Sequence, residues 1–413
     1  MPKHVVIVGG GVIGGFTAWY LAELGHRVTV IDKGAFGGGC SHGNCGYVSP
    51  SHVIPLARPG QVRHGLRGLF TREAALRIAP AQLLQLAPWL LRFARRCNPR
   101  AMLEAGNACH PLLASSAALY RDLIGRHGLD VEWRAEGLLF VFRDRHGFDE
   151  YAALDAWLRT NFGVTAEPLA GQALTDVEPA LKPGLAGAWL YRCDAQLHPG
   201  KLMNELRRLL LTAGVTIHEH SPLTRFEARQ GRAAAAVTPA GAIEGDEFVV
   251  ATGAWTPLLA AELGTRLPIQ PGKGYSITMR RPEVCPRYPM ILEECHVGIT
   301  PLDSAYRIGS TMEFAGYDDT LDRRRLQFLR KGAAEFLREP TADPVEEEWC
   351  GWRPMTADGI PYVDRAPRLA NVWLATGHSM LGISMGTGTG RLVAELISGH
   401  KPHLDPALYR VNR

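Results

Sequence analysis

Three glycines and one aspartate near the start of the chain have the types and spacing that bind a dinucleotide. Gly9, Gly11 and Gly14 form a Gly-x-Gly-x-x-Gly pattern, and Asp32 follows further on. Glycines so spaced allow a tight turn, a close approach of backbone to a pyrophosphate, and close packing of a helix on a strand, while the acid accepts hydrogen bonds from a ribose. These four residues predict a cofactor that contains adenosine diphosphate.

The elements that must hold these residues are also present in the sequence. Residues 5–8 predict a buried strand, residues 16–24 a helix, and residues 27–31 a second strand that ends at Asp32. Gly25 provides a helix C-cap. The predicted apolar face of the helix consists of Ala18, Leu21 and Ala22. A lone glycine pattern occurs in many tight turns, but these flanking elements favour a nucleotide site.

Composition limits the class of protein. A chain of 413 residues can form two or more domains, and a net charge of +4 without a basic, aromatic-interleaved motif argues against a nucleic-acid partner. The eight cysteines include no C-x-x-C pair, so neither zinc nor an iron–sulfur cluster is expected. No apolar run reaches the ~20 residues of a membrane span, and a strand so near the N-terminus leaves no room for a signal peptide. We expect a cytoplasmic protein.

Nucleotide-like segments open the chain, recur in its middle and close it. A simple NAD dehydrogenase would complete one such domain before making another, so this interleaving favours a flavoprotein. We predict an α/β fold with an FAD-binding Rossmann-like domain and an interleaved mixed-sheet α+β substrate domain. The predicted FAD-binding domain comprises residues 1–78, 194–264 and 350–413, and the predicted substrate domain comprises residues 79–193 and 265–349.

Two further segments each allow two interpretations. The glycine-dense residues 33–50 can wrap a cofactor with backbone amides or form a flexible surface loop. Residues 61–125 read as helical and partly basic, and the apolar run 83–93 lies beside Arg92, Arg95 and Arg96. This run either packs against its own domain or rests on a bilayer, which would place the protein peripherally at the inner face of the plasma membrane.

Two motifs in the last sixty or so residues carry a resemblance to a known family. They are GWRPMT-x-DG-x-P at residues 351–361 and TGH-x-x-LG-x-x-x-x-x-GTG at residues 376–390. With them the sequence resembles the D-amino-acid oxidase superfamily of FAD enzymes. Within it, the likeness is to bacterial FAD-dependent D-amino-acid dehydrogenases, with glycine oxidase and sarcosine oxidase more distant. The resemblance covers essentially the whole chain, and these motifs are far more specific than the N-terminal glycines.

The resemblance implies non-covalent FAD and a set of residues that bind it. The glycine-rich turn 377–384 and the positive N-terminus of the last predicted helix, residues 391–397, would lie near the flavin edge that becomes negative when hydride arrives. The implied set is Gly9, Gly11, Val12, Ile13 and Gly14 at the pyrophosphate, Asp32, Lys33 and the Leu223 backbone at the adenosine, Ser41, Asn44, Gly46 and Val48 along the phosphates and flavin, then Ala251, Thr252 and Gly253, and finally Gly377, Gly382, Ile383 and Ser384.

The resemblance also implies four substrate-site residues. Arg353 would bind the substrate carboxylate; a surface ion pair is the alternative, but a guanidinium between Trp352 and Pro354 is expected to be buried and to need an anion. Tyr275 would lie on a strand that approaches the flavin. Relatives usually carry a tyrosine where this chain has His296, which predicts a different substrate preference. His378 would either face the substrate or orient its turn.

The implied activity is that of an FAD-dependent D-amino-acid dehydrogenase. It would oxidise the Cα–N bond of a D-amino or D-imino acid by hydride transfer to flavin N5, and pass electrons to a quinone or an electron-transfer protein. We favour D-proline or cis-4-hydroxy-D-proline, because His296 can hydrogen-bond a ring hydroxyl. The alternatives are a glycine or sarcosine oxidase, an L-proline-type dehydrogenase, and a flavin-binding subunit of a larger electron-transfer complex.

Overall fold

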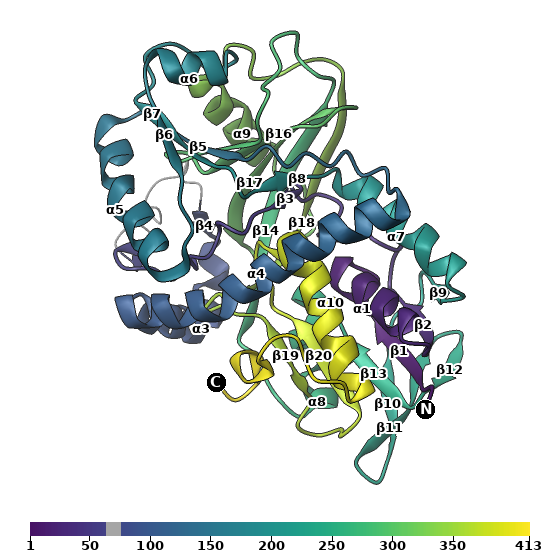
Figure 1. Cartoon of the computed structure of the whole chain (residues 1–413). Coiled ribbons are helices and arrows are strands. Elements are labelled where there is room, and N and C mark those ends of the chain that lie inside the picture. Colours follow the sequence, from purple (N-terminus) through teal and green to yellow (C-terminus); the bar gives the residue numbers. More distant parts are fainter. Residues whose placement is uncertain (63–75) are drawn as a thin grey trace.

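The computed structural model describes residues 1–62 and 76–413, and one of its two large sheets is the predicted nucleotide sheet (Figure 1). It has six strands in the order β19-β20-β13-β1-β2-β9, of which only the β19–β20 pair is antiparallel. The predicted strands at 5–8 and 27–31 are confirmed. The strands are β1 (His4–Val8), β2 (Arg27–Ile31), β9 (Thr216–His218), β13 (Glu247–Val250), β19 (Tyr362–Arg365) and β20 (Val372–Thr376).

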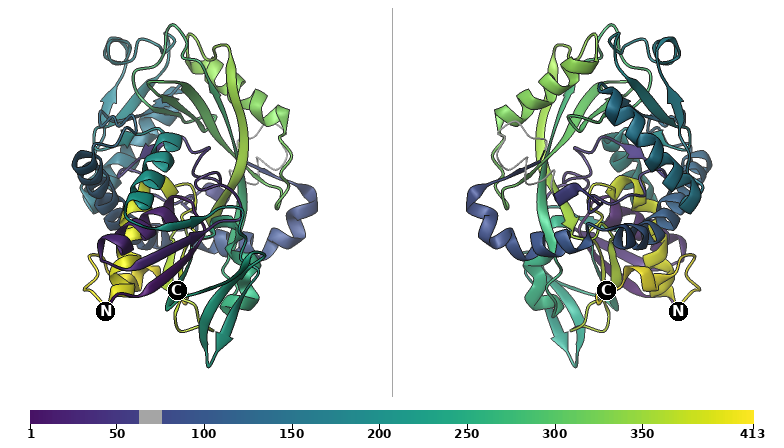
Figure 2. Two further views of the ribbon diagram at one scale, coloured as in Figure 1. Left: turned by 90° about the vertical axis from the view of Figure 1, so that its right-hand side faces the viewer. Right: turned by 90° about the vertical axis from the view of Figure 1, so that its left-hand side faces the viewer.

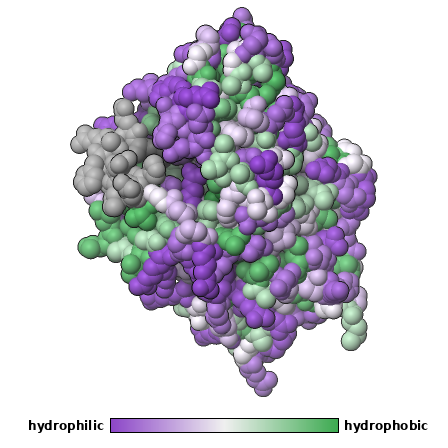
Figure 3. Space-filling model, turned by 60° about the vertical axis from the view of Figure 1, so that its left-hand side comes forward, coloured by the Kyte–Doolittle hydropathy of each residue, from purple (hydrophilic) through white to green (hydrophobic). Residues whose placement is uncertain are grey.

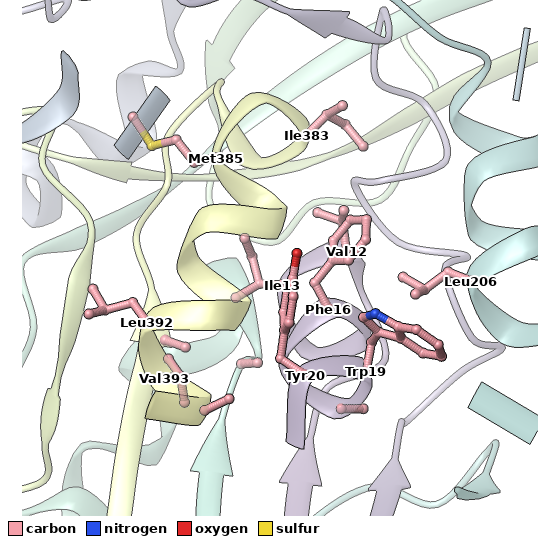
Figure 4. Close-up of a cluster of buried hydrophobic side chains, with 14 of the residues drawn as sticks. Val12, Ile13, Phe16, Trp19, Tyr20, Leu206, Ile383, Met385, Leu392 and Val393 are labelled. Atoms are coloured by element: carbon pink, nitrogen blue, oxygen red, sulfur yellow. The ribbon is translucent and has the colours of Figure 1, made fainter. Parts of the chain in front are cut away.

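The helix α1 (Val12–Glu23) lies between α7 (Pro199–Thr212) and α10 (Gly382–Ser398) (Figure 4). Every residue of α1 from position 12 to position 21 is buried, because α10 and α7 cover the sides that the sheet leaves open. The apolar face predicted at Ala18, Leu21 and Ala22 is therefore only part of the buried surface.

The last helix begins earlier than predicted. A glycine-rich turn was expected at residues 377–384 and the last helix at 391–397, but α10 already begins at Gly382. A Cβ on Gly390 would lie 2.6 Å from the backbone carbon of Phe16, and one on Gly388 would lie 3.0 Å from the carbonyl oxygen of Leu112. These glycines allow close packing between helices. From the sequence alone, such a run of glycines instead predicts a turn.

The second sheet is mixed and has nine strands, in the order β18-β14-β17-β16-β15-β5-β7-β6 with β4 also paired to β17. It pairs a strand from the middle of the chain, β5, with β15 from a segment much later in the sequence, which confirms a separate mixed layer. The helix α9 (Arg323–Phe336) packs its leucines into the core of this sheet. The strands are β4 (Leu76–Ile78), β5 (Leu138–Phe142), β6 (Glu167–Leu169), β7 (Gly187–Tyr191), β14 (Ile269–Met279), β15 (Met290–Leu292), β16 (Val297–Pro301), β17 (Tyr306–Phe314) and β18 (Val345–Thr356).

The two sheets are joined by elements that cross the predicted domain edges. The strand β18 runs unbroken through residue 350, and with β14 it reaches the 3-10 helix η2 (Gly253–Leu259) that follows β13 (Figure 2). The long helix α4 (Pro99–His127) packs on α10, with Ser116 Oγ 2.7 Å from Thr387 Oγ1. The division into two domains stays a prediction.

The remaining elements complete the molecule around these layers. Helices α3 and α4 confirm most of the helical segment predicted at 61–125, whereas its basic residues Arg63, His64, Arg67 and Arg72 lie outside the described residues. The remaining elements are β3 (Tyr47–Val48) paired with β8 (Ala195–Gln196), the sheet of β10 (Arg225–Arg229), β11 (Arg232–Thr238) and β12 (Gly241–Glu244), the helices α3 (Leu83–Arg96), α5 (Arg145–Phe162), α6 (Gln172–Val177) and α8 (Ala260–Leu263), and the 3-10 helices η1 (Pro80–Gln82) and η3 (Pro406–Tyr409).

The glycine contact between α10 and α1 can be tested by substitution. Gly390→Ala would force a methyl group against the Phe16 backbone, so we expect the free energy of unfolding to fall by about 1–3 kcal/mol. Gly125→Ala is the matched control, because a Cβ at that helical position meets nothing within 4 Å. The control should be neutral or slightly stabilising in urea unfolding. Equal effects of the two substitutions would contradict this account of the packing.

Candidate active site

A cavity of about 680 Å³ lies between the glycine-rich loop that follows β2 and the nine-stranded sheet. Its walls come from this loop, from β5, α5 and β17, from the turn between β15 and β16, from β18, and from the start of α10. The cavity therefore combines segments from both sheets. Four of the predicted site residues line it: Asn44, His296, Arg353 and Ser384.

The predicted phosphate-binding turn is fastened to the loop that follows it. The Asp32 carboxylate accepts the backbone N–H groups of Gly10 at 2.6 Å and Gly34 at 2.7 Å. The Ser41 hydroxyl accepts the backbone N–H of Val12 at 3.0 Å, at the N-terminus of α1. Each carboxylate oxygen can accept a second hydrogen bond, so Asp32 remains available to a ribose.

The glycines of this region fall into two groups, and the difference tests whether the site fits FAD. A Cβ on Gly14 would lie 1.9 Å from the carbonyl oxygen of Gly9, and one on Gly9 would lie 2.5 Å from that of Ala251, so the fold itself requires both. At Gly11 the nearest atom would be Ser41 Oγ at 3.4 Å, and at Gly382 it would be Val12 Cγ1 at 3.9 Å. The protein leaves space in front of Gly11 and Gly382, as a bound pyrophosphate and flavin would need. These residues fit FAD.

The N-terminus of α10 is bound to the strand β3. Ser384 Oγ donates to the carbonyl of Tyr47 at 2.8 Å and accepts the N–H of Ser49 at 3.2 Å. The side chain of Ile383 is buried in the core, so this residue offers only its backbone to a ligand (Figure 4). The first amides of a helix have no partner within it, and they carry partial positive charge. The cavity therefore meets an electropositive helix end.

Other predicted cofactor residues hold the backbone of the site in place. Gly46 has φ +81°, and a Cβ there would lie 2.1 Å from the carbonyl oxygen of Leu197. Asn44 Oδ1 accepts the N–H of Gly46 at 2.8 Å. The ammonium of Lys33 lies 3.5 Å above the ring of Trp255, and burial lowers its pKa. The others occupy the turns beside the strand ends: Val48 is buried in β3, Ala251, Thr252 and Gly253 follow β13, Leu223 precedes β10, and Gly377 follows β20 with φ +81°.

Arg353 is half-buried on β18 and lines the cavity. Its Nη1 donates to the carbonyl of Thr311 at 2.6 Å, and its guanidinium fills the space above Gly274, where a Cβ would lie 2.4 Å from Cζ. Among the described residues, no carboxylate oxygen lies within 4.0 Å of it. A guanidinium has five N–H donors, so most of its donors are left for a ligand.

Tyr275 does not reach the cavity. Its side chain is 1% exposed, and its hydroxyl donates to Glu313 Oε2 at 2.9 Å. Burial is the main reason that its pKa rises, and Glu313 raises it further. Because side chains alternate along a strand, Gly274 faces Arg353 and Tyr275 faces the core beneath. This placement contradicts the predicted contact of Tyr275 with the substrate.

The two predicted histidines occupy different environments. His378 is 2% exposed, lies outside the cavity lining, and has Nε2 2.9 Å from Thr389 Oγ1. Burial lowers its pKa to about 3, so the ring is neutral. Of the two predicted roles, the geometry contradicts substrate contact and favours orientation of the turn. His296 lines the cavity with φ +50°, immediately before β16.

Several titratable residues of the cavity were missed in the sequence. Arg58, His52 and Glu293 are three of them. Burial raises the pKa of Glu293 to about 7 and lowers that of His52 to about 4. They lie in irregular segments with no motif, so no local signal distinguishes them, and only the fold brings them together.

The chain is similar in sequence and in fold to several known proteins. A D-amino acid dehydrogenase from Agrobacterium fabrum is 34% identical over 408 residues, which cover 97% of each chain. Another from Chromohalobacter salexigens is 34% identical over 420 residues, covering 99% of each. The glycine oxidase of Geobacillus kaustophilus superposes with a TM-score of 0.79 at 24% identity, over 100% of this chain and 99% of the other.

A more distant solved structure, the L-proline dehydrogenase of P. horikoshii, superposes with a TM-score of 0.73 at 20% identity, over 100% of this chain and 98% of the other. At such identities the solved structures show a shared fold alone. The family described as FAD dependent oxidoreductase matches residues 4–396. This match confirms the predicted fold class, cofactor and enzyme class: the chain belongs to the family of FAD-dependent oxidoreductases.

Proposed function

We propose that this FAD-dependent oxidoreductase oxidises the Cα–N bond of D-amino or D-imino acids. The observation that carries the proposal is the guanidinium of Arg353 on the cavity wall, without a carboxylate partner among the described residues. A half-buried arginine of this kind suits a planar anion, and an amino-acid carboxylate fits its paired donors. The names of the curated relatives, which are D-amino acid dehydrogenases, support the D configuration.

The chain's own residues mainly bind the cofactor and the substrate and orient them relative to each other. Bound FAD supplies the hydride acceptor. Arg353 fixes the carboxylate, which limits the directions in which the α-hydrogen can point. The amine reacts in its neutral form, and the imine that results takes up water to give a 2-oxo acid and ammonia when the amine was primary. The N-terminus of α10 stabilises the negative charge that the transfer delivers. The cofactor residues named above would hold FAD mainly through backbone amides, including those residues whose side chains are buried.

Within this class we favour D-proline or cis-4-hydroxy-D-proline as substrate. His296 lines the cavity and presents a group that can hydrogen-bond a ring hydroxyl. An anaerobic scan of D- and L-amino acids for loss of flavin absorbance tests both the class and the preference. If only L-amino acids or glycine bleached the flavin, the proposal would fail.

We further propose that electrons pass to a membrane quinone, with α3 resting on the bilayer. One face of α3 packs inward through Leu86 and Trp89, whereas Leu84 is 90% and Leu91 54% exposed. Figure 3 shows apolar surface gathered on the side of the molecule where α3 lies. Arg92 and Arg95 are exposed on the same helix, as anionic lipid would require. Among the described helices, none has the length and hydropathy to cross a membrane.

Gly11 provides a test of the cofactor site. Gly11→Ala places a methyl group where the phosphates approach, so we expect the Kd for FAD to rise by roughly tenfold or more. The thermal midpoint of the FAD-free protein should stay unchanged, because no described atom crowds that methyl group. Gly125→Ala, on α4 and with nothing within 4 Å of the added Cβ, is the control and should leave FAD binding unchanged. Unchanged FAD binding by Gly11→Ala would move the phosphate site elsewhere.

Arg353→Lys tests the carboxylate contact. Lysine keeps the charge but cannot supply paired, planar donors. We expect kcat/KM on the best D-substrate to fall by roughly 30- to 1000-fold, which corresponds to about 2–4 kcal/mol, while FAD content is retained. Arg143→Lys is the control, because Arg143 also lines the cavity but is already paired with Glu335. Near wild-type kcat/KM in Arg353→Lys would assign the carboxylate to another residue.

The acceptor proposal is tested with vesicles that contain phosphatidylglycerol and a quinone. The reduced enzyme should be reoxidised faster by these vesicles than by dissolved oxygen. Leu84→Ser should slow the reaction with vesicles but leave the reaction with a soluble dye unchanged. Leu258→Ser, at a 64% exposed leucine outside α3, should affect neither. Rapid hydrogen peroxide production in air would contradict the proposal.

A further inference from the structure

Two polar side chains, the guanidinium of Arg58 and the carboxyl group of Glu293, face the same cavity without touching. Arg58 lies in the loop after β3, and Glu293 begins the turn between β15 and β16. No nitrogen of Arg58 lies within 4.0 Å of a carboxylate oxygen of Glu293. Neither side chain makes a hydrogen bond or ion pair with any other residue in the described part of the chain. Both are half-buried.

The backbone of each residue is hydrogen-bonded to a different segment. The N–H of Glu293 donates to the carbonyl of Val141 at 3.0 Å, which ties the residue to β5. The N–H of Arg58 donates to Leu56 at 3.0 Å, within its own loop. Charges withdrawn from water without a partner are costly, so a ligand group that satisfies both would be bound favourably.

The chemistry of that ligand group follows from the cationic character of Arg58 and the acidic character of Glu293. An ammonium group would pair with Glu293 and be repelled by Arg58. A carboxylate would pair with Arg58 and be repelled by Glu293. A hydroxyl accepts a hydrogen bond from the guanidinium and donates one to the carboxylate, so it satisfies both without adding charge. The pair therefore selects a neutral group that both donates and accepts.

The neighbouring walls fit a small hydrocarbon body that carries such a group. Phe140, Leu154 and Leu158 line the cavity with apolar surface. The other charged groups near Glu293 are already used: Glu294 accepts the backbone N–H groups of Arg143 and Asp144, each at 2.8 Å. A mostly apolar pocket with few polar groups fixes the orientation of its ligand.

We propose that Arg58 and Glu293 bind the hydroxyl group of a hydroxylated D-amino or D-imino acid while Arg353 binds its carboxylate. This inference rests on the proposed function and deepens it, because it assigns specificity to a second polar pair. The substrate is held at two points, and the hydroxyl decides which amino acid is preferred.

The test compares substrates that differ by one hydroxyl: cis-4-hydroxy-D-proline with D-proline, and D-serine with D-alanine. In the FAD-loaded wild-type enzyme, kcat/KM should favour the hydroxylated member of at least one pair by roughly tenfold or more, because the unhydroxylated analogue leaves both polar groups unpaired. Equal values in both pairs would overturn the inference without any variant.

The double variant Arg58→Met, Glu293→Leu removes both charges together, because a single substitution would leave the other charge buried and unpaired. It should lower the hydroxyl preference by roughly 10- to 100-fold while the unhydroxylated substrate stays within about threefold. Glu293→Gln is the milder variant to use if the double variant does not retain FAD, and it should lower the preference in the same direction.

His296→Ala separates the two sources of preference. Loss of the hydroxyl preference in His296→Ala, with the double variant unaffected, would assign the hydroxyl to His296 and overturn the inference while the proposed function stands. Failure of the proposed function is distinguishable, because then no D-amino or D-imino acid bleaches the wild-type flavin, hydroxylated or not.

Discussion

The backbone contact between α1 and its neighbours is the constraint on which the rest of the structure depends. Glycines let α1 touch the strand–turn before it and α10 beside it, since a Cβ on Gly14 or Gly390 would overlap backbone atoms. The same contact brings the first turns of α1 and α10 together. A Cβ added to Gly382 would lie 3.9 Å from the side chain of Val12. Two positive helix ends therefore meet at one place, which is what an anionic cofactor requires.

A buried arginine extends this constraint to the second sheet. Arg307 on β17 is 2% exposed, and its Nη1 donates to the carbonyls of His42 and Asn44 at 2.8 Å each. Burial lowers its pKa. The loop that joins the dinucleotide turn to β3 is thus held by a strand of the other sheet. Because one loop borders both the cofactor region and the cavity, the two are positioned by a single set of hydrogen bonds.

The sequence predicted those parts of the fold whose signals are local. The buried strands, the phosphate-binding turn and the GWRP motif each occupy a few consecutive residues. The strands were correctly located, and the roles of the turn and of Arg353 stay predictions. The predicted start of α10 was wrong because its glycines are required by contacts with residues on α1 and α4, which are far away in the sequence. Tyr275 was misplaced because the face of a strand depends on its partner strands. Arg58 and Glu293 were missed because irregular segments lack the residue periodicity that indicates which side chains face inward.

The continuity of β18 separates two properties of this protein. Arg353 stands inside a strand that pairs with β14 from Val345 opposite Met279 to Thr356 opposite Ile269. A residue so placed cannot shift without disturbing the ladder between β18 and β14. The walls formed by residues 52–58 and 293–296 belong to irregular segments, which are not held by a strand ladder. Under the proposed function, the end of the cavity that binds the carboxylate is therefore fixed by the sheets, whereas the end that selects the side chain can change without disturbing either sheet.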